Sequence, residues 1–461
     1  MRGGRSLLIL LVVALGLGAY IFFVESKREP GGGDTTAAKK AKVFTTESSK
    51  FEEVNIHAVT GETTTLKKKN GLWEIVAPQS MPTDSGEIGG LLSSLESLEV
   101  QSVVSETPAS AADFGLEPPR FTVSFKAEGA GAPMELQVGK KTPTGGDLYA
   151  RVAGQPRVFL ISAFLEGSLS KTPFNLRDKT ILKFERDAAD MLTVEKTGSP
   201  ALAFAKKGQD WRFSKPYEAK ADSTIVDNLV SKLSQARMTS VVTDDGTKEL
   251  TKYGLDKPAA TATVGAGSAR ATLVFGSKKD DGSVYARDAS RPAVFTVEGA
   301  LLDDLTKSPD DIRRKDLFEF RTFSALSLEV TYAGQTLVFE KQKAPAPAAN
   351  ADPNAAPPPD VWKQTKPAAK DVELGKIVEL MTAISNLKAD KFADKAITTG
   401  EEMSVTAKFG EAAKPSQESV KFRKGGAVVH ATIAGETGAA VVAATDYDHV
   451  ITLIKGLAGI K

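Results

Sequence analysis

The sequence predicts an α+β protein in which an N-terminal transmembrane helix is followed by tandem repeats of antiparallel sheet, each covered by one main helix. Three observations predict this architecture: an uncharged apolar run near the N-terminus, a recurring order of strand, tryptophan and amphipathic helix, and strands that alternate buried and exposed side chains. The expected parts are a cytoplasmic N-terminus and anchor, a flexible linker and three repeats, at residues 1–24, 25–42, 43–181, 182–323 and 324–461.

The anchor is predicted from residues 7–24. As a helix at about 1.5 Å per residue, this run reaches roughly 27 Å, close to the ~30 Å hydrocarbon core of a bilayer. Arg2 and Arg5 precede it and favour a cytoplasmic N-terminus, which would place the rest of the chain outside. A cleaved signal peptide is the alternative, because Gly16 and Gly18 are spaced like a cleavage site. We expect an uncleaved anchor, since the apolar run continues past these glycines.

Composition bounds the function of the exported part. The 461 residues are 41% hydrophobic and 25% charged, as in a folded chain of two to four domains. Lys and Arg number 59 against 58 Asp and Glu, so no field of one sign would attract nucleic acid. The absence of cysteine excludes disulfides, thiolate metal sites and a cysteine nucleophile.

Three tryptophans mark the repeats. Trp73 and Trp211 are 138 positions apart, and Trp362 follows after a further 151, the excess being an Ala/Pro-rich insert at residues 344–359. Each tryptophan is expected to end a meander of three strands. We expect Trp73 and Trp211 at equivalent core positions, where replacement by alanine costs about 3 to 5 kcal/mol.

A capping aspartate and an amphipathic helix follow each tryptophan. Asp84, Asp222 and Asp371 are expected to accept hydrogen bonds from free N–H groups in the first turn. Apolar residues then recur at helical spacing, which implies one buried face per helix and one sheet for it to cover.

The next shared element is a turn of sequence Phe-Gly-Leu-Glu-Pro-Pro, residues 114–119, which matches residues 253–258 and is lost in the third repeat. Its glycines, Gly115 and Gly254, can take a positive φ. Tyr149 and Tyr285 follow in matching Tyr-Ala-Arg strands, where they are expected to be structural.

The strongest catalytic pattern is Ser168 with Lys171, an S-x-x-K sequence followed by Lys-Thr-Gly at residues 196–198. When the closing helices of the first two repeats are aligned, Asp304 takes the place of the serine and Lys307 that of the lysine. We therefore interpret the serine as a surface residue of a structural helix. The two motifs are also too close for an intervening domain. We therefore expect no enzyme.

Metal, cofactor and nucleotide sites have no support in the sequence. Its three histidines, His57, His430 and His449, lack ligands at metal spacing, and His430 takes the place of the repeat tyrosines. The glycines at residues 265–267 lack the third glycine of a dinucleotide fingerprint. No cofactor is expected.

Two loops remain as possible interaction sites. Residues 139–145 and 276–282 each place two lysines at the same corner of a repeat, and ordinary hairpin turns are the alternative reading. The lysines are Lys140, Lys141, Lys278 and Lys279.

These residues carry a family resemblance. The N-terminal anchor, the Gly-Leu-Trp strand at residues 71–73, the helix opening at Asp84, the turn at residues 114–119 and the Tyr-Ala-Arg strand resemble bacterial membrane-anchored proteins of the domain-of-unknown-function 4340 family. Members are commonly encoded beside ABC-transporter genes and an auxiliary gene of the gliding-motility type. The resemblance implies a non-enzymatic, single-pass protein of the inner membrane, with its bulk periplasmic, that serves as an accessory or scaffold subunit of a transporter complex.

A second class of function stays open. A binding module for cell-wall glycan or a small ligand would show as a pocket lined by aromatic residues beside the strands of Tyr149 and Tyr285. Only 7% of the residues are aromatic, which makes this reading the weaker one.

Overall fold

The computed structural model describes residues 40–342 and 361–459. The predicted anchor at residues 7–24 and the insert at residues 344–359 lie outside the described residues. Among the helices within the described ranges, none is both long and apolar enough to cross a bilayer.

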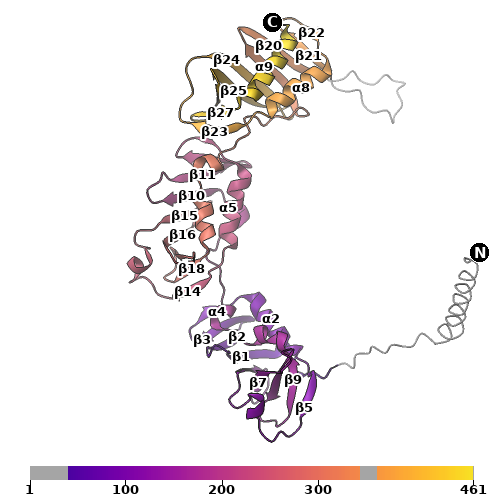
Figure 1. Cartoon of the computed structure of the whole chain (residues 1–461), viewed down its shortest axis with the longest axis vertical. Helices are drawn as coiled ribbons and strands as arrows, with labels where there is room; N and C mark the ends of the chain where they lie inside the picture. The colour runs from indigo at the N-terminus through magenta and orange to yellow at the C-terminus, as the bar shows by residue number, and fades with distance from the viewer. Residues whose placement is uncertain (1–39, 343–360, 460–461) are drawn as a thin grey trace, which may run out of the picture. The chain divides into compact units, whose positions relative to one another are not determined.

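The described chain forms three antiparallel sheets of nine strands each, one sheet in each repeat (Figure 1). The first sheet comprises β1 Phe51–His57, β2 Thr63–Lys69, β3 Leu72–Ala77, β4 Met81–Pro82, β5 Ser102–Ser105, β6 Phe121–Ala127, β7 Met134–Lys141, β8 Asp147–Val152 and β9 Val158–Ser162. The second comprises β10 Met191–Lys196, β11 Leu202–Lys207, β12 Asp210–Lys215, β13 Ala219–Lys220, β14 Ser240–Thr243, β15 Ala260–Ala266, β16 Ala269–Lys278, β17 Val284–Asp288 and β18 Val294–Val297. The third comprises β19 Ala325–Tyr332, β20 Gln335–Gln342, β21 Val361–Lys366, β22 Lys370–Asp371, β23 Ala389–Ala393, β24 Glu401–Phe409, β25 Ser416–Gly425, β26 Val428–Ile433 and β27 Ala439–Val442.

All three sheets have the same topology. In the first, the order β4-β3-β2-β1-β6-β7-β8-β9-β5 joins two meanders through the central pair β1 and β6, and the other two sheets repeat it strand for strand. The two-residue strands β4, β13 and β22 extend the first meander beyond the predicted three strands. Compact packing divides the chain after Lys179, so that the first unit holds the first sheet and the second unit holds the other two.

Each sheet is covered by helix on one face. The main helices are α2 Ser85–Glu96, α5 Ser223–Gln235 and α8 Leu374–Ser385, and the shorter ones are α3 Glu166–Leu169, α4 Pro173–Leu176, α6 Gly299–Leu305 and α7 Pro309–Ile312. The third repeat departs from the expected single main helix, because α9 Ala444–Ala458 is longer than α8 and lies beside it. Figure 1 shows both helices over the third sheet.

The predicted caps are present in two of the three repeats. Asp84 accepts from the backbone N–H groups of Gly86 and Glu87, and Asp222 accepts from Thr224 and Ile225. The prediction for Asp371 is wrong. That residue lies in β22, and Glu373 precedes α8 without a side-chain cap.

The cores follow from the alternation of the strands. Phe121, Val123 and Phe125 of β6 are fully buried beneath α2, whose buried residues are Ile88, Leu91 and Leu95. Because one face of each sheet packs on a helix, every second side chain is removed from water.

Candidate functional site

The three tryptophans occupy the same register but not the same environment. Lys68, Lys206 and Lys341 are the cross-strand partners of Trp73, Trp211 and Trp362. Trp211 is 1% exposed and Trp362 is 4% exposed, as predicted for core residues. Trp73 packs against the core of the first repeat but is only partly buried.

The main helix of each repeat explains this difference. The fifth residue after the N-cap is Asp227 in α5, Val378 in α8 and Gly89 in α2. Asp227 accepts a 2.7 Å hydrogen bond from the Trp211 Nε1–H, and Val378 packs against the core of its repeat. A Cβ atom built on Gly89 would meet no atom within 4 Å. The helix of the first repeat therefore leaves part of the Trp73 ring exposed.

A cleft of about 580 Å³ opens at this place in the first repeat. Its lining includes the apolar residues Leu72, Trp73, Met81, Ile88 and Leu92, small residues such as Gly71, Ser80, Ser85 and Gly89, and one carboxylate, Glu74. Leu72, one of the lining residues, is 74% exposed, so apolar surface at the cleft is open to water. The arrangement can receive an apolar group from a partner.

The charged groups around the cleft are bonded to neighbours. Glu74 lies 2.9 Å from the Lys69 ammonium, and Glu87 lies 2.6 Å from the ammonium of Lys171. The lysine of the S-x-x-K pattern is thus held by a helix carboxylate. The rim offers no unbalanced charge of either sign, which favours an apolar occupant.

The predicted lysine loops lie at equivalent corners of the first two repeats. At the first corner, the turn around Gly115 crosses the end of β7 so closely that a Cβ atom on Gly139 would lie 2.2 Å from the Phe114 carbonyl oxygen. At the second, a Cβ atom on Gly276 would lie 2.1 Å from the Tyr253 carbonyl oxygen. Both crossings require glycine, because any side chain would collide with the carbonyl oxygen. The sequence does not reveal this requirement, since the two segments approach each other only in the folded repeat.

The tyrosines complete these corners. The rings of Phe114 and Tyr149 lie 5.1 Å apart, as do those of Tyr253 and Tyr285. Gly115 has φ +69° and Gly254 has φ +68°, as expected for this turn. In the third repeat His430 takes the tyrosine position, and its Nδ1 accepts a 3.2 Å hydrogen bond from the backbone N–H of Ile397.

The lysines themselves differ between the corners. Lys140 is exposed, and Lys141 is half-exposed with its ammonium 3.0 Å from Glu166. Although partial burial acts to raise it, hydrogen bonds from Lys141 and Arg120 hold the pKa of Glu166 below its usual value. At the second corner, Lys278 is 4.0 Å from Asp303 and Lys279 is 3.0 Å from Asp281. Hydrogen bonds from Ser283 and Lys279 lower the pKa of Asp281 to about 2.

The described residues contain no group of three or more His, Asp or Glu side chains placed to hold a metal ion. His57 and His449 are exposed on different repeats. Neither has a second histidine beside it.

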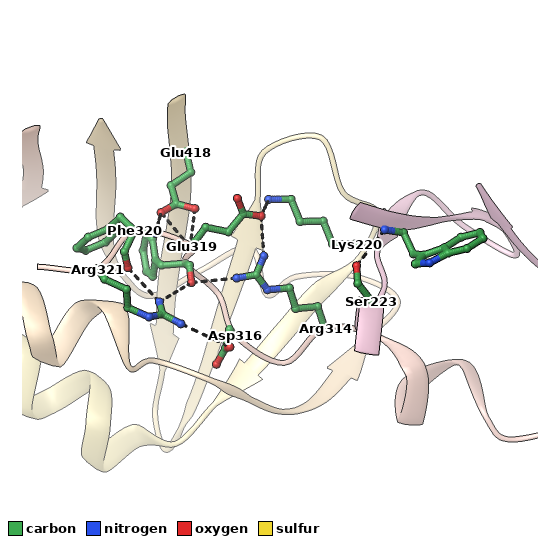
Figure 2. A network of polar contacts seen from close by, with 10 residues as sticks. Lys220, Ser223, Arg314, Asp316, Glu319, Phe320, Arg321 and Glu418 are labelled. Carbon is green, nitrogen blue, oxygen red and sulfur yellow. Dashed lines mark hydrogen bonds and ion pairs between the residues drawn. The ribbon is translucent and has the colours of Figure 1, made fainter. Parts of the chain in front are cut away.

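The second compact unit contains a polar junction between its two repeats, which the sequence did not predict. Figure 2 shows Lys220 and Arg314 converging on the carboxylate of Glu319, with Arg314 Nη1 at 2.6 Å from Glu319 Oε1. The carboxylate of Glu418, in β25, accepts hydrogen bonds from the backbone N–H groups of Glu319 and Phe320. Burial raises the pKa of Glu418. Burial opposes but does not overcome the effect of Lys220 and Arg314, which lower the pKa of Glu319.

A second contact strengthens the same junction. Arg313 and Glu436 form a 3.0 Å ion pair in which both side chains are 4% exposed. The Arg313 guanidinium also lies 5.2 Å from the ring centre of Tyr217 and 4.2 Å from that of Phe392. A buried ion pair of this kind fixes the geometry of the contact, because loss of either partner leaves an uncompensated charge.

A family model described as a domain of unknown function, DUF4340, matches residues 73–212 and 211–406. The first match runs from Trp73 to the residue after Trp211, which is one period of the repeat. No curated protein matches the chain. Since the family model covers well over half of the sequence, the chain belongs to the DUF4340 family.

Proposed function

We propose that this protein is a non-enzymatic accessory subunit, anchored in the bacterial inner membrane by residues 7–24, whose exported repeats dock a membrane-protein partner. The observation that carries the proposal is the open cleft beside Trp73, at a position that Asp227 and Val378 occupy in the other repeats. The equivalent space beside Trp211 is smaller, about 270 Å³, and most of the residues that line it are polar. The first repeat is also the one that follows the predicted anchor in the sequence.

Tethering makes such a cleft sufficient for function. Confining two proteins to one membrane raises their effective concentration, so a contact of modest area can be occupied. A permease of the ABC type, or its auxiliary subunit, is the partner that the family context favours. The junction within the second unit supports a scaffold role, because its buried ion pair holds two repeats as one body.

The test uses the full chain in its native membranes, with co-purified membrane proteins as the measurement. Gly89→Asp copies the second repeat and should cover Trp73, lowering partner recovery about tenfold. Ser93→Asp places the same charge one turn further along α2, outside the cleft, and should leave recovery unchanged.

Two outcomes would contradict the proposal. If Gly89→Asp and wild type recover the same membrane proteins equally, the cleft is not the docking site. If no membrane protein is recovered, and purified peptidoglycan binds wild type but not Gly89→Asp, the protein is a glycan-binding module instead.

A further inference from the structure

The end of the first repeat that carries residues 163–166 has an exposed aromatic ring that the fold does not use. Phe164 is 94% exposed, the highest exposure among the large hydrophobic side chains in the described ranges. It lies in the 3₁₀ turn η4 (Ala163–Leu165), directly after β9. The equivalent residue in the second repeat, counted from the aligned Leu169 and Leu305, is Ala300.

The lysine loop lies at the same end of the sheet. The backbone N–H of Ala163 donates a 3.0 Å hydrogen bond to the carbonyl of Gly146, and Lys141 is bonded to Glu166 in the next turn. The exposed ring is therefore at the same end of the sheet as Lys141 and its neighbour in the chain, Lys140, two cations that the sequence predicts as possible interaction residues.

The chain also enters the first repeat at this end. The backbone N–H of Val100 donates to the carbonyl of Ala41, and that of Gln101 donates to Leu160 of β9. The entering segment is thus about two strand spacings, roughly 10 Å, from β9. It brings two more exposed cations, Lys40 and Lys42.

The length of the preceding chain fixes what this end can reach. Fifteen residues separate Val24 from Lys40, and if they form the linker that the sequence predicts, a random coil of this length would have a root-mean-square span of about 20–25 Å. If residues 7–24 span the membrane, as the proposed function requires, this end of the first repeat lies close to the bilayer surface.

We propose that this end of the first repeat rests on the lipid bilayer, with Phe164 inserted at the headgroup boundary and Lys40, Lys42, Lys140 and Lys141 facing anionic headgroups. An exposed aromatic ring with lysines at the same end of the sheet suits this interface, because the ring leaves water while the ammonium groups stay at the phosphates. Contact at this end would leave the Trp73 cleft available to a protein partner.

The absence of cysteine permits a direct test on the full chain. Gly167→Cys, an exposed position where a Cβ atom meets nothing within 4 Å, accepts an environment-sensitive fluorophore one turn from Phe164. The labelled protein is reconstituted into vesicles of phosphatidylcholine with or without phosphatidylglycerol, and quenching by spin-labelled lipid is measured. Asp303→Cys, the matched position in the second repeat, is the control.

We expect strong quenching at position 167 in vesicles that contain phosphatidylglycerol, and little at position 303. Phe164→Ala and Lys140→Gln with Lys141→Gln should each reduce the quenching several-fold. Equal quenching at the two positions would overturn the proposal. The proposal would also be overturned if the label at position 167 were shielded from water in native membranes but not in vesicles that contain this protein alone. That result would identify another protein as the occupant.

These outcomes are separable from failure of the proposed function. Phe164→Ala should leave partner recovery through the cleft unchanged, and Gly89→Asp should leave lipid quenching unchanged. A chain that washes off the vesicles would contradict the anchor on which both proposals rest.

Discussion

The first and second repeats have the same strand order, the same cap and the same tryptophan register, yet the cleft beside Trp73 is about 580 Å³ and the space beside Trp211 only about 270 Å³. One position on the main helix accounts for this. Asp227 covers and hydrogen-bonds Trp211, whereas Gly89 leaves Trp73 partly exposed. In a duplicated fold, a site can therefore arise by removing a side chain, without any new catalytic or binding residue.

The largest expected effect concerns the tryptophans themselves. Trp211→Ala should lower the free energy of unfolding of its repeat by about 3–5 kcal/mol, because it empties a closed core site. Trp73→Ala should cost clearly less, about 1–2 kcal/mol, because part of the ring is already in water. Hydrogen exchange of core amides in each repeat of the full chain measures both. Equal costs would mean that the cleft is closed in solution.

The next largest effect comes from converting the second repeat into the first. Asp227→Gly removes the acceptor of the Trp211 indole N–H and introduces glycine into a helix, so we expect a loss of about 2 kcal/mol. Tryptophan fluorescence should shift to longer wavelength as water reaches the ring. An unshifted spectrum would show that other residues keep the second site closed.

The junction of the second unit predicts a pH-dependent effect of intermediate size. The pKa of Glu319 is lowered in the folded state, so its ion pairs stabilise the fold above the unfolded pKa near 4.5, and this stability is lost as pH falls through the folded pKa. Glu319→Gln should cost about 1–2 kcal/mol at pH 7 and progressively less in acid. Denaturant unfolding at several pH values tests this, and a pH-independent cost would contradict it.

The raised pKa of Glu418 acts in the opposite direction at the same junction. Its burial disfavours the carboxylate, so protonation as pH falls relieves part of that penalty. The free energy of unfolding of the wild-type protein should therefore fall less on acidification than the loss of the Glu319 ion pairs alone would cause.

The smallest expected effect is a gain in stability. Gly89→Ala places a better helix former where no atom lies within 4 Å of the new Cβ, and should stabilise the first repeat by about 0.5–1 kcal/mol. Gly90→Ala is the matched control, with the same open surroundings but no place in the cleft lining. Both should raise the midpoint of thermal unfolding. A fall for Gly89→Ala alone would mean that the glycine is needed by the fold.

The repeats, their helices and the first two caps could be predicted because local signals carry them. Asparagine-glycine turns, capping aspartates and helical spacing depend on neighbours in the chain. The difference in exposure between Trp73 and Trp211 was not predicted, since Gly89 and Trp73 come together only in the folded repeat. The contact between Glu319 and Glu418 could not be predicted either, because the two residues are 99 positions apart and no local sequence pattern links them. The two-residue strand β4 was too short to have a periodicity.

The short strands at the sheet edges also limit unwanted pairing between sheets. Every sheet ends in a strand of two residues on one side, β4, β13 or β22, and in a strand of four or five on the other, β5, β14 or β23. A long free edge would offer its unpaired N–H and C=O groups to the identical edge of a neighbouring repeat or molecule, and three tandem copies would multiply that risk. Short edge strands limit such strand exchange, so each of the three sheets can keep its own nine strands.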